Sequence, residues 1–328
     1  MRKVILGKTG LEVSAVGMGG HEYLPDGRSR GFNEDRAKSL TPGYLFGGFG
    51  GENRMNVLKA AYDLGLNFFD VTQDSEKEAL GRNFSLLPPP YEVFIQTRPE
   101  RMAYGYDRFN IGMTKLNLLR EEVQRINKLM RMERLDFLNI PPLKWAFDND
   151  PDYLDKIGYN ISNLKQEGLI RFASADTFSG AGIYRKMIES GVFDAIYINF
   201  NFGDHTPGDE IIPLAKQKGL GVITREAFMK GDLFKMAKAA GVAAELAAGA
   251  ALRWVLSGKG VDTVFYGTGK AHHLADVCRS ADAPFSPEDE ATLEEIRRTA
   301  MFAKYEKRRA DEFGGLTERM DLLDYSDR

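Results

Sequence analysis

Three observations predict that this chain folds as a (β/α)8 barrel. Short β-rich apolar runs alternate with longer stretches of helical period along most of the sequence. The alternation occurs eight times within about 250 residues, which is a typical length for such a barrel. Several helical stretches also close with a glycine, the residue expected just past a helix end. Strands joined by helices favour a parallel sheet, and eight such units close most simply into a barrel.

The expected barrel strands share a short apolar run of β-forming residues. They are Ala15–Met18, Asn67–Phe69, Val93–Thr97, Asp136–Ile140, Ile170–Ala173, Ala195–Ile198, Gly221–Thr224 and Thr263–Tyr266. An open, doubly wound sheet is the alternative, but no strand is followed by the GxGxxG motif that opens a dinucleotide-binding helix. The Gly-rich stretch at 47–53 follows no strand and lacks the Lys-Ser/Thr of a phosphate loop, so we interpret it as a loop.

The 328 residues are expected to form one barrel domain with an extension at each end. Residues 1–14 contain two short strands typical of a β-hairpin, which would plug the barrel floor. The barrel is assigned to 15–283. In the extension 284–328, Ser286 is followed by Pro and acidic residues, which predicts the start of a helix. The charged end, 308–328, is interpreted as a tail or as an arm that contacts a partner, such as a second copy of the chain.

Composition excludes several classes of function. The chain is 43% hydrophobic and 28% charged with a net charge of −3, so it lacks the basic excess of a nucleic-acid-binding protein. It has no run of 18 apolar residues for a membrane helix and no signal-peptide pattern at its start, so we expect a cytoplasmic protein. The single cysteine, Cys278, excludes an internal disulfide, and the four histidines show no metal-ligand spacing.

Asp70 is the first candidate for chemistry. The stretch FFDVTQDSEKEALGRN, 68–83, begins as a buried strand and ends as an amphipathic helix, with Asp70 at the point of change. Ligands of α/β folds meet the protein at the carboxyl ends of parallel strands. We therefore expect Asp70 on the ligand-binding face.

An ordered set of segments resembles the aldo-keto reductase superfamily over most of the chain, roughly Met1 to Ala283. The segments are LGKTGLEVSAVGMGG, AYDLGLNFFD, EALGRN, EGLIRFASADTFS, INFNF, ALRWVLS and YGTGKAHHLADV. The resemblance implies a (β/α)8 barrel that binds NADP(H) across its C-terminal face. It also implies hydride transfer between the nicotinamide and a carbonyl or alcohol.

The family's catalytic tetrad is only partly present. Its Asp falls on Asp70, but the stretch that follows is four residues shorter and lacks the acid Tyr. The family Lys falls on Arg98, and the family His falls on Pro141. Arginine keeps its proton at every working pH, so Arg98 can polarise an oxygen but cannot relay a proton. We expect a charge-assisted Asp70–Arg98 pair and a poor reductase of simple aldehydes; a purely structural ion pair is the alternative.

The resemblance also assigns the cofactor positions, which again differ from the family pattern. The nicotinamide positions fall on Asp176, Thr177, Tyr197 and Arg225, the last in place of the stacking aromatic side chain. The 2′-phosphate positions fall on Thr268, His273 and Val277, while Lys270 and the turn at Gly267 remain. A helix N-terminus at this turn favours a phosphate through its free N–H groups.

Three residues are candidates to replace the missing acid. His21 follows the first barrel strand and titrates near neutral pH. Tyr104 and Tyr106 lie on the loop after Arg98, from which one phenol could fold into the site. A hydrogen-bonded loop histidine and ordinary loop aromatics are the alternatives. The charged groups around this face predict a small polar ligand, anionic or polyhydroxylated, and no metal ion.

Three functions remain open from the sequence. The first is an NADP(H)-linked oxidoreductase with a rearranged acid–base set. The second is a redox-neutral isomerase, lyase or hydrolase that uses Asp70, Arg98 and His21 on the same barrel. The third is a ligand- or cofactor-binding protein without catalysis. The fold alone does not choose among them, because one barrel supports many chemistries.

Overall fold

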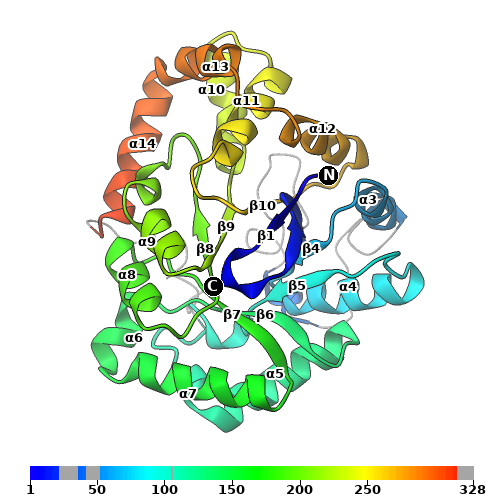
Figure 1. Ribbon diagram of the computed structural model, residues 1–328, viewed down its shortest axis with the longest axis vertical. Helices are drawn as coiled ribbons and strands as arrows, with labels where there is room; N and C mark the ends of the chain where they lie inside the picture. The colour runs from blue at the N-terminus through cyan, green and yellow to red at the C-terminus, as the bar shows by residue number, and fades with distance from the viewer. Residues whose placement is uncertain (22–35, 42–51, 105, 316–328) are drawn as a thin grey trace.

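The barrel predicted from the sequence is present in the computed structural model, which describes residues 1–21, 36–41, 52–104 and 106–315 (Figure 1). Eight parallel strands close in the order β10-β3-β4-β5-β6-β7-β8-β9. They are β3 (Val16–Gly19), β4 (Phe68–Asp70), β5 (Phe94–Thr97), β6 (Leu135–Ile140), β7 (Ile170–Ala175), β8 (Ala195–Asn199), β9 (Gly221–Arg225) and β10 (Thr263–Tyr266). The eight predicted strands are thereby confirmed, and no strand end differs by more than two residues.

Helices surround the barrel (Figure 1). They are α2 (Arg36–Ser39), α3 (Glu52–Asp63), α4 (Asp74–Leu86), α5 (Leu116–Met130), α6 (Lys144–Asn149), α7 (Tyr153–Gln166), α8 (Ala181–Glu189), α9 (Ile211–Gln217), α10 (Asp232–Ala239), α11 (Ala244–Leu256), α12 (Ala271–Ala281), α13 (Pro287–Arg297) and α14 (Ala300–Phe313). In α5 the buried Leu119, Val123, Ile126 and Met130 recur at helical spacing and form its inner face. Among the described residues, no helix is long and apolar enough to cross a bilayer.

The N-terminal hairpin closes one end of the barrel, as predicted. Strands β1 (Lys3–Ile5) and β2 (Glu12–Ser14) pair antiparallel and cross the centre of the barrel in Figure 1. The backbone N–H of Lys8 donates to the Gly219 carbonyl at 2.6 Å. Gly7 has a φ of +48°, and a Cβ at this position would lie 2.2 Å from the Gly221 nitrogen. The hairpin therefore approaches the start of β9 so closely that only glycine fits.

The barrel interior is apolar near the hairpin and polar at the other end. Phe68 packs against Phe265 and Phe137, with ring centroids 4.8 and 5.5 Å apart, and Leu6 of the hairpin joins this cluster. Because side chains alternate along a strand, the residue two positions after each inward apolar residue also points inward, nearer the C-terminal end. These inward polar residues include Asp70, Gln96, Asn139, Ser174, Tyr197 and Arg225. The alternation of side chains along the strands thus places these polar groups inside the C-terminal end of the barrel.

The C-terminal extension contains two helices where the sequence predicted one. Helix α13 begins at the predicted Ser286 cap, whose side chain accepts the N–H of Asp289 at 3.2 Å. Thr299 then starts α14 by accepting the N–H of Phe302. Arg309 of α14 is buried and donates to Asp204 at 2.7 Å. The start of the predicted tail is therefore a packed helix.

Two regions named from the sequence lie wholly or partly outside the described residues. The tail beyond residue 315 is one of them. Of the Gly-rich stretch at 47–53, only the last two residues are described, and they begin α3.

Candidate active site

Asp70 lies at the C-terminal end of β4 and accepts hydrogen bonds from two neutral groups. The Gln96 amide donates to Oδ1 at 3.2 Å, and the Tyr197 hydroxyl donates to Oδ2 at 3.1 Å. Burial raises the pKa of Asp70 above its usual range, although these two donors and the nearby His21 and Arg98 act in the opposite direction. A carboxyl with a raised pKa at the ligand end of a barrel is a candidate for proton transfer or for binding hydroxyl groups.

The predicted direct pair between Asp70 and Arg98 is wrong. Arg98 instead donates through Nε to the buried Glu100 carboxylate at 2.5 Å. Glu100 begins the short 3-10 helix Glu100–Met102, which brings its side chain back to Arg98 only two residues away. Arg98 still lies near enough to Asp70 to lower its pKa. The ion pair is therefore local to the end of β5, and among the described residues Asp70 accepts hydrogen bonds from neutral groups only.

His21 forms an ion pair beside Asp70. Its Nδ1 lies 2.6 Å from Oε1 of Glu76, whose side chain is 1% exposed, while the side chain of His21 is 26% exposed. Glu76 also accepts the backbone N–H groups of Thr72 and Gln73, so its position is fixed by the first turn of α4. Burial disfavours the imidazolium, but the Glu76 carboxylate outweighs it and raises the pKa of His21 above its usual range.

A glycine allows His21 to approach β4. A Cβ at Gly20 would lie 2.7 Å from Cγ1 of Val71 and 2.9 Å from the Asp70 carbonyl oxygen. Any larger residue at this position would push the end of β3 away from β4. Gly20 thus brings the imidazole of His21 to the same corner of the barrel as the carboxyl of Asp70.

A second ion pair occupies the opposite side of the barrel end. Asp176, fully buried after β7, accepts both Nη groups of Arg225 at 2.7 and 2.8 Å. Nε of Arg225 donates to Oδ1 of Asn199 at 2.5 Å. The guanidinium also lies 4.2 Å from the ring centroid of Tyr197 and 4.7 Å from that of Phe178. Arg225 is therefore held by a bidentate pair, a third hydrogen bond and two aromatic rings.

Tyr104 is folded into the site on a strained backbone. It has a φ of +52°, which is rare for a bulky residue, and it is 1% exposed. Its hydroxyl lies 3.3 Å from Nη1 of Arg98 and donates to Oδ2 of Asp176 at 3.4 Å. Burial raises the pKa of Tyr104 far above its usual range. One of the two predicted phenols is thus present, at the junction of the two arginine pairs.

The second predicted phenol, Tyr106, and a further histidine, His205, differ in their surroundings. Tyr106 is half-buried in the turn that follows, with its backbone N–H bonded to the Ala103 carbonyl at 3.1 Å. His205, on the loop after β8, pairs with Glu306 of α14 at 3.0 Å. The catalytic roles of Asp70, His21, Tyr104 and Tyr106 remain predictions.

The four positions assigned to the nicotinamide end are already bonded to protein groups. Asp176 is bound by Arg225, and Tyr197 donates to Asp70. Thr177 donates to the Pro142 carbonyl at 2.7 Å. A carboxamide needs a free acceptor and a free donor, and a ring needs an open flat surface. In this arrangement the residues do not fit the nicotinamide end of the cofactor.

Of the positions assigned to the phosphate end, Lys270 and His273 are exposed, whereas Thr268 and Val277 are buried. Oγ1 of Thr268 accepts the N–H of Lys270 at 3.1 Å in the turn before α12. Lys270 caps α12 without a side-chain hydrogen bond to the helix, and its ammonium is exposed. Burial, with the neighbouring His272 and Lys270, lowers the pKa of His273. Gly267 precedes this turn, and the group fits a phosphate better than a neutral ligand.

Several site residues were not identified from the sequence. Gln96 and Asn139 point inward two positions after Phe94 and Phe137, so the strand period would have located them. Both amide atoms of Asn139 are buried and have no hydrogen-bond partner. Glu100 had no such signal, because its contact with Arg98 depends on a local turn. In the part of the chain that the structure describes, no three His, Cys, Asp or Glu side chains form a metal-binding group.

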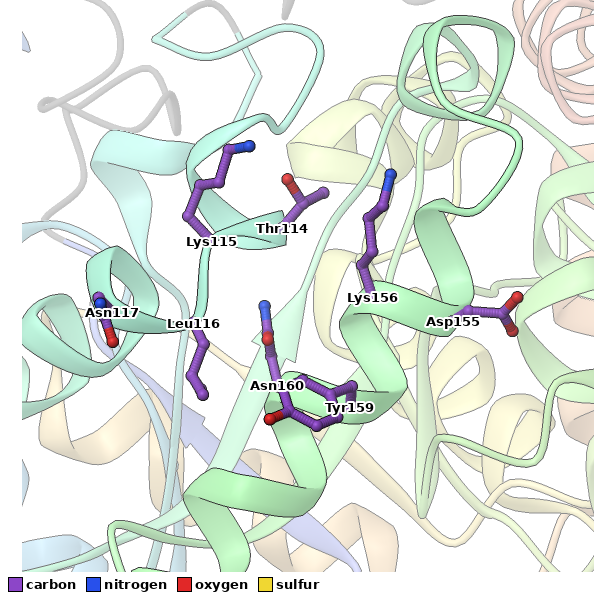
Figure 2. Close-up of a pocket in the computed structure, with 8 residues that line it drawn as sticks. All are labelled: Thr114, Lys115, Leu116, Asn117, Asp155, Lys156, Tyr159 and Asn160. Carbon is purple, nitrogen blue, oxygen red and sulfur yellow. The ribbon is translucent and has the colours of Figure 1, made fainter.

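A hollow of about 590 Å³ lies outside the barrel, where α5 and α7 begin (Figure 2). Two of the polar side chains that line it are bonded to other protein groups. Lys156 pairs with Asp150 at 2.7 Å, and the Asn160 amide donates to the Met113 carbonyl at 2.8 Å. The candidate active site therefore remains the C-terminal end of the barrel.

Comparisons with known proteins agree with the barrel fold. A curated relative, L-galactose dehydrogenase of Arabidopsis thaliana, is 26% identical over 238 residues, which cover 70% of this chain and 66%, just under two thirds, of the relative. A holo aldo-keto reductase from Bacillus halodurans superposes with a TM-score of 0.65 at 18% identity, covering 90% of this chain and 96% of that one. An aldo/keto reductase from Klebsiella pneumoniae in complex with NADP and acetate has a TM-score of 0.61 at 15% identity, covering 90% and 94%.

At these identities the solved structures support the fold alone. The family assignment comes from a sequence model described as the aldo/keto reductase family, which matches residues 44–242, more than half of the chain. The chain therefore belongs to the aldo/keto reductase family of oxidoreductases.

Proposed function

We propose that this chain is an oxidoreductase that interconverts the carbonyl and alcohol forms of a small polyhydroxylated molecule, with NADP(H) as the hydride carrier. The family and the name of the Arabidopsis relative support a sugar-like substrate. A solved neighbour in complex with NADP supports the carrier. Oδ atoms of Asp70 can accept hydroxyl hydrogens, which suits a polyol.

The observation that carries the proposal is the His21–Glu76 pair beside Asp70. Reduction of a carbonyl requires a proton at the oxygen, and oxidation of an alcohol requires its removal. His21 supplies the proton in its charged form and accepts it in its neutral form. The contact with Glu76 at 2.6 Å orients the imidazole and favours the charged form near neutral pH.

A redox-neutral reaction is the second candidate, favoured by one observation. The Arg225–Asp176 pair uses the positions assigned to the nicotinamide end. If no ring binds there, His21 and Asp70 remain as an acid–base set for isomerisation or elimination on the same polar substrate.

The test is a steady-state assay of NADPH oxidation with neutral aldoses, and of NADP reduction with the same sugars. We expect turnover by the wild-type protein and a loss of about 10²- to 10⁴-fold in kcat for His21→Asn. His205→Asn is the matched control, because His205 also pairs with a glutamate but on α14, and it should leave kcat unchanged. Equal activity of the two variants would remove His21 from the mechanism. A sugar product formed without any change in the nucleotide would favour the redox-neutral reaction.

A further inference from the structure

At the ends of β7, β8 and β9, two of the positions assigned to the nicotinamide are bonded to one another. Asp176 follows β7, Asn199 ends β8, and Arg225 ends β9. Arg225 spans all three by donating to Asp176 and to Asn199. The side chain of Asp176 is 0% exposed and that of Arg225 is 12% exposed. A planar, charged group of the chain itself therefore lies where three strand ends converge.

We propose that the Arg225–Asp176 ion pair stands in for the nicotinamide end of the nucleotide, so that a nicotinamide ring binds only at the expense of this pair. The proposal rests on the function proposed above, in which NADP(H) is the hydride carrier. It follows because every residue that the resemblance assigns to the ring already forms a hydrogen bond with another group of the protein. The guanidinium is flat and flanked by the Tyr197 and Phe178 rings, as a bound ring would be.

Separating the Arg225–Asp176 pair costs free energy, which opposes the entry of a nicotinamide ring. The bidentate contact between Arg225 and Asp176 is a charge-assisted pair shielded from water, and separating it leaves two buried charges. Burial opposes the charge of Arg225, but Asp176 more than compensates and keeps the pKa of Arg225 well above its usual range. Arg225 therefore does not leave the pair by losing its proton at any working pH. A ring that enters must replace these contacts with new ones.

The two ends of the nucleotide should therefore contribute differently to the binding affinity. Contacts with a phosphate at the start of α12 do not involve Arg225, which is the last residue of β9. The affinity for a fragment without a ring, 2′,5′-ADP, should therefore be independent of the pair. The additional affinity that a nicotinamide ring normally contributes should be absent.

Isothermal titration of the full-length protein with NADPH and with 2′,5′-ADP tests this directly. For the wild-type protein we expect the two dissociation constants to agree within about threefold. In the double variant Asp176→Ser/Arg225→Tyr, both charges are removed together, so no unpaired charge remains buried. There NADPH should bind about tenfold more tightly or better, as expected for one regained stacking contact and one hydrogen bond.

The control is Arg120→Tyr/Glu167→Ser, which removes another bidentate pair, at 2.6 and 2.7 Å, from the exposed surface. It should leave both dissociation constants unchanged. A wild-type protein that prefers NADPH to 2′,5′-ADP by more than tenfold overturns the inference, and this outcome does not depend on the double variant being folded. Failure of both ligands to bind either protein also overturns it, as does an unchanged ratio in a folded double variant.

Turnover separates this inference from the proposed function. Sugar-dependent NADPH oxidation by a protein that strongly prefers NADPH to the fragment would reject the inference and leave the function standing. Equal affinities without turnover of any substrate, by the wild-type protein or the double variant, would support the inference and reject the function.

Discussion

The two sides of the barrel end hold their charged groups in different ways. On the side of β3, β4 and α4, the partly exposed imidazole of His21 pairs with Glu76 beside Asp70. On the side of β5 to β9, the cations are the guanidinium groups of Arg98 and Arg225, each bonded to a buried carboxylate. An imidazole can change its charge near neutral pH, whereas a guanidinium keeps its charge at every working pH.

This difference assigns separate tasks to the two sides. The pKa of the His21 imidazole and that of the Asp70 carboxyl are both raised above their usual ranges. We therefore expect proton transfer on this side. On the arginine side the charged groups bond to one another, so we expect this side to contribute to shape and stability.

The largest expected effect is the loss of stability on breaking the arginine side. Asp176→Ala leaves the guanidinium of Arg225 buried without its carboxylate, which should lower the free energy of unfolding by about 3 to 5 kcal/mol. Glu167→Ala removes the carboxylate of the exposed pair with Arg120 and should cost about 1 kcal/mol or less. Urea unfolding of both variants measures the difference. Equal losses of unfolding free energy in the two variants would mean that the Arg225–Asp176 pair stabilises the protein no more than an exposed ion pair does.

Much of the fold was predictable because strand and helix periods are local properties of a sequence. The alternation of Phe68 with Asp70 places the carboxylate inside the barrel end, and the same period places Gln96 and Asn139. The division of the C-terminal extension was not predicted, because Thr299 looks like any exposed threonine until its hydroxyl accepts the N–H of Phe302.

The partners within the site were less predictable because they depend on geometry beyond the strand period. Arg98 binds Glu100 through a local 3-10 turn, which competes successfully with Asp70 on the neighbouring strand. Arg225 and Asp176 lie on β9 and after β7, with β8 between them, so their contact crosses a strand. Neither pairing follows from strand ends alone. Residue type and position were correct at Asp70, and the choice of partner was not.

A smaller effect is expected on the titrating side from Glu76→Gln. The raised pKa of His21 means that its charged form stabilises the folded protein below pH 6.5, and this contribution is lost as the pH rises through the folded-state pKa. Without the carboxylate, burial remains and should bring the pKa of His21 down. The variant should lose on the order of 2 kcal/mol of stability at low pH, as for a hydrogen bond to a charged group.

The measurement is the chemical shift of the His21 imidazole as a function of pH, assigned among the four histidines by comparison with His21→Asn. A matched change, Glu306→Gln, removes the partner of His205 and should leave the titration of His21 unaffected. If Glu76→Gln left the pKa of His21 in place, then Glu76 would not be what distinguishes the two sides of the barrel end.

The smallest expected effect concerns Asn139, which points into the barrel from β6, on the arginine side. Its amide is 2% exposed and neither of its polar atoms has a partner, whereas the equally buried Asn160 donates to the Met113 carbonyl at 2.8 Å. A buried polar group without a partner costs more than an apolar group of the same shape. Asn139→Leu should therefore stabilise the ligand-free protein by about 1 kcal/mol, while Asn160→Leu should destabilise it by about 1 to 3 kcal/mol.

Urea unfolding measures both changes. A loss of stability in Asn139→Leu as large as that in Asn160→Leu would mean that the Asn139 amide is hydrogen-bonded in solution, and the polar interior would then extend without a break from Asp70 to Asp176.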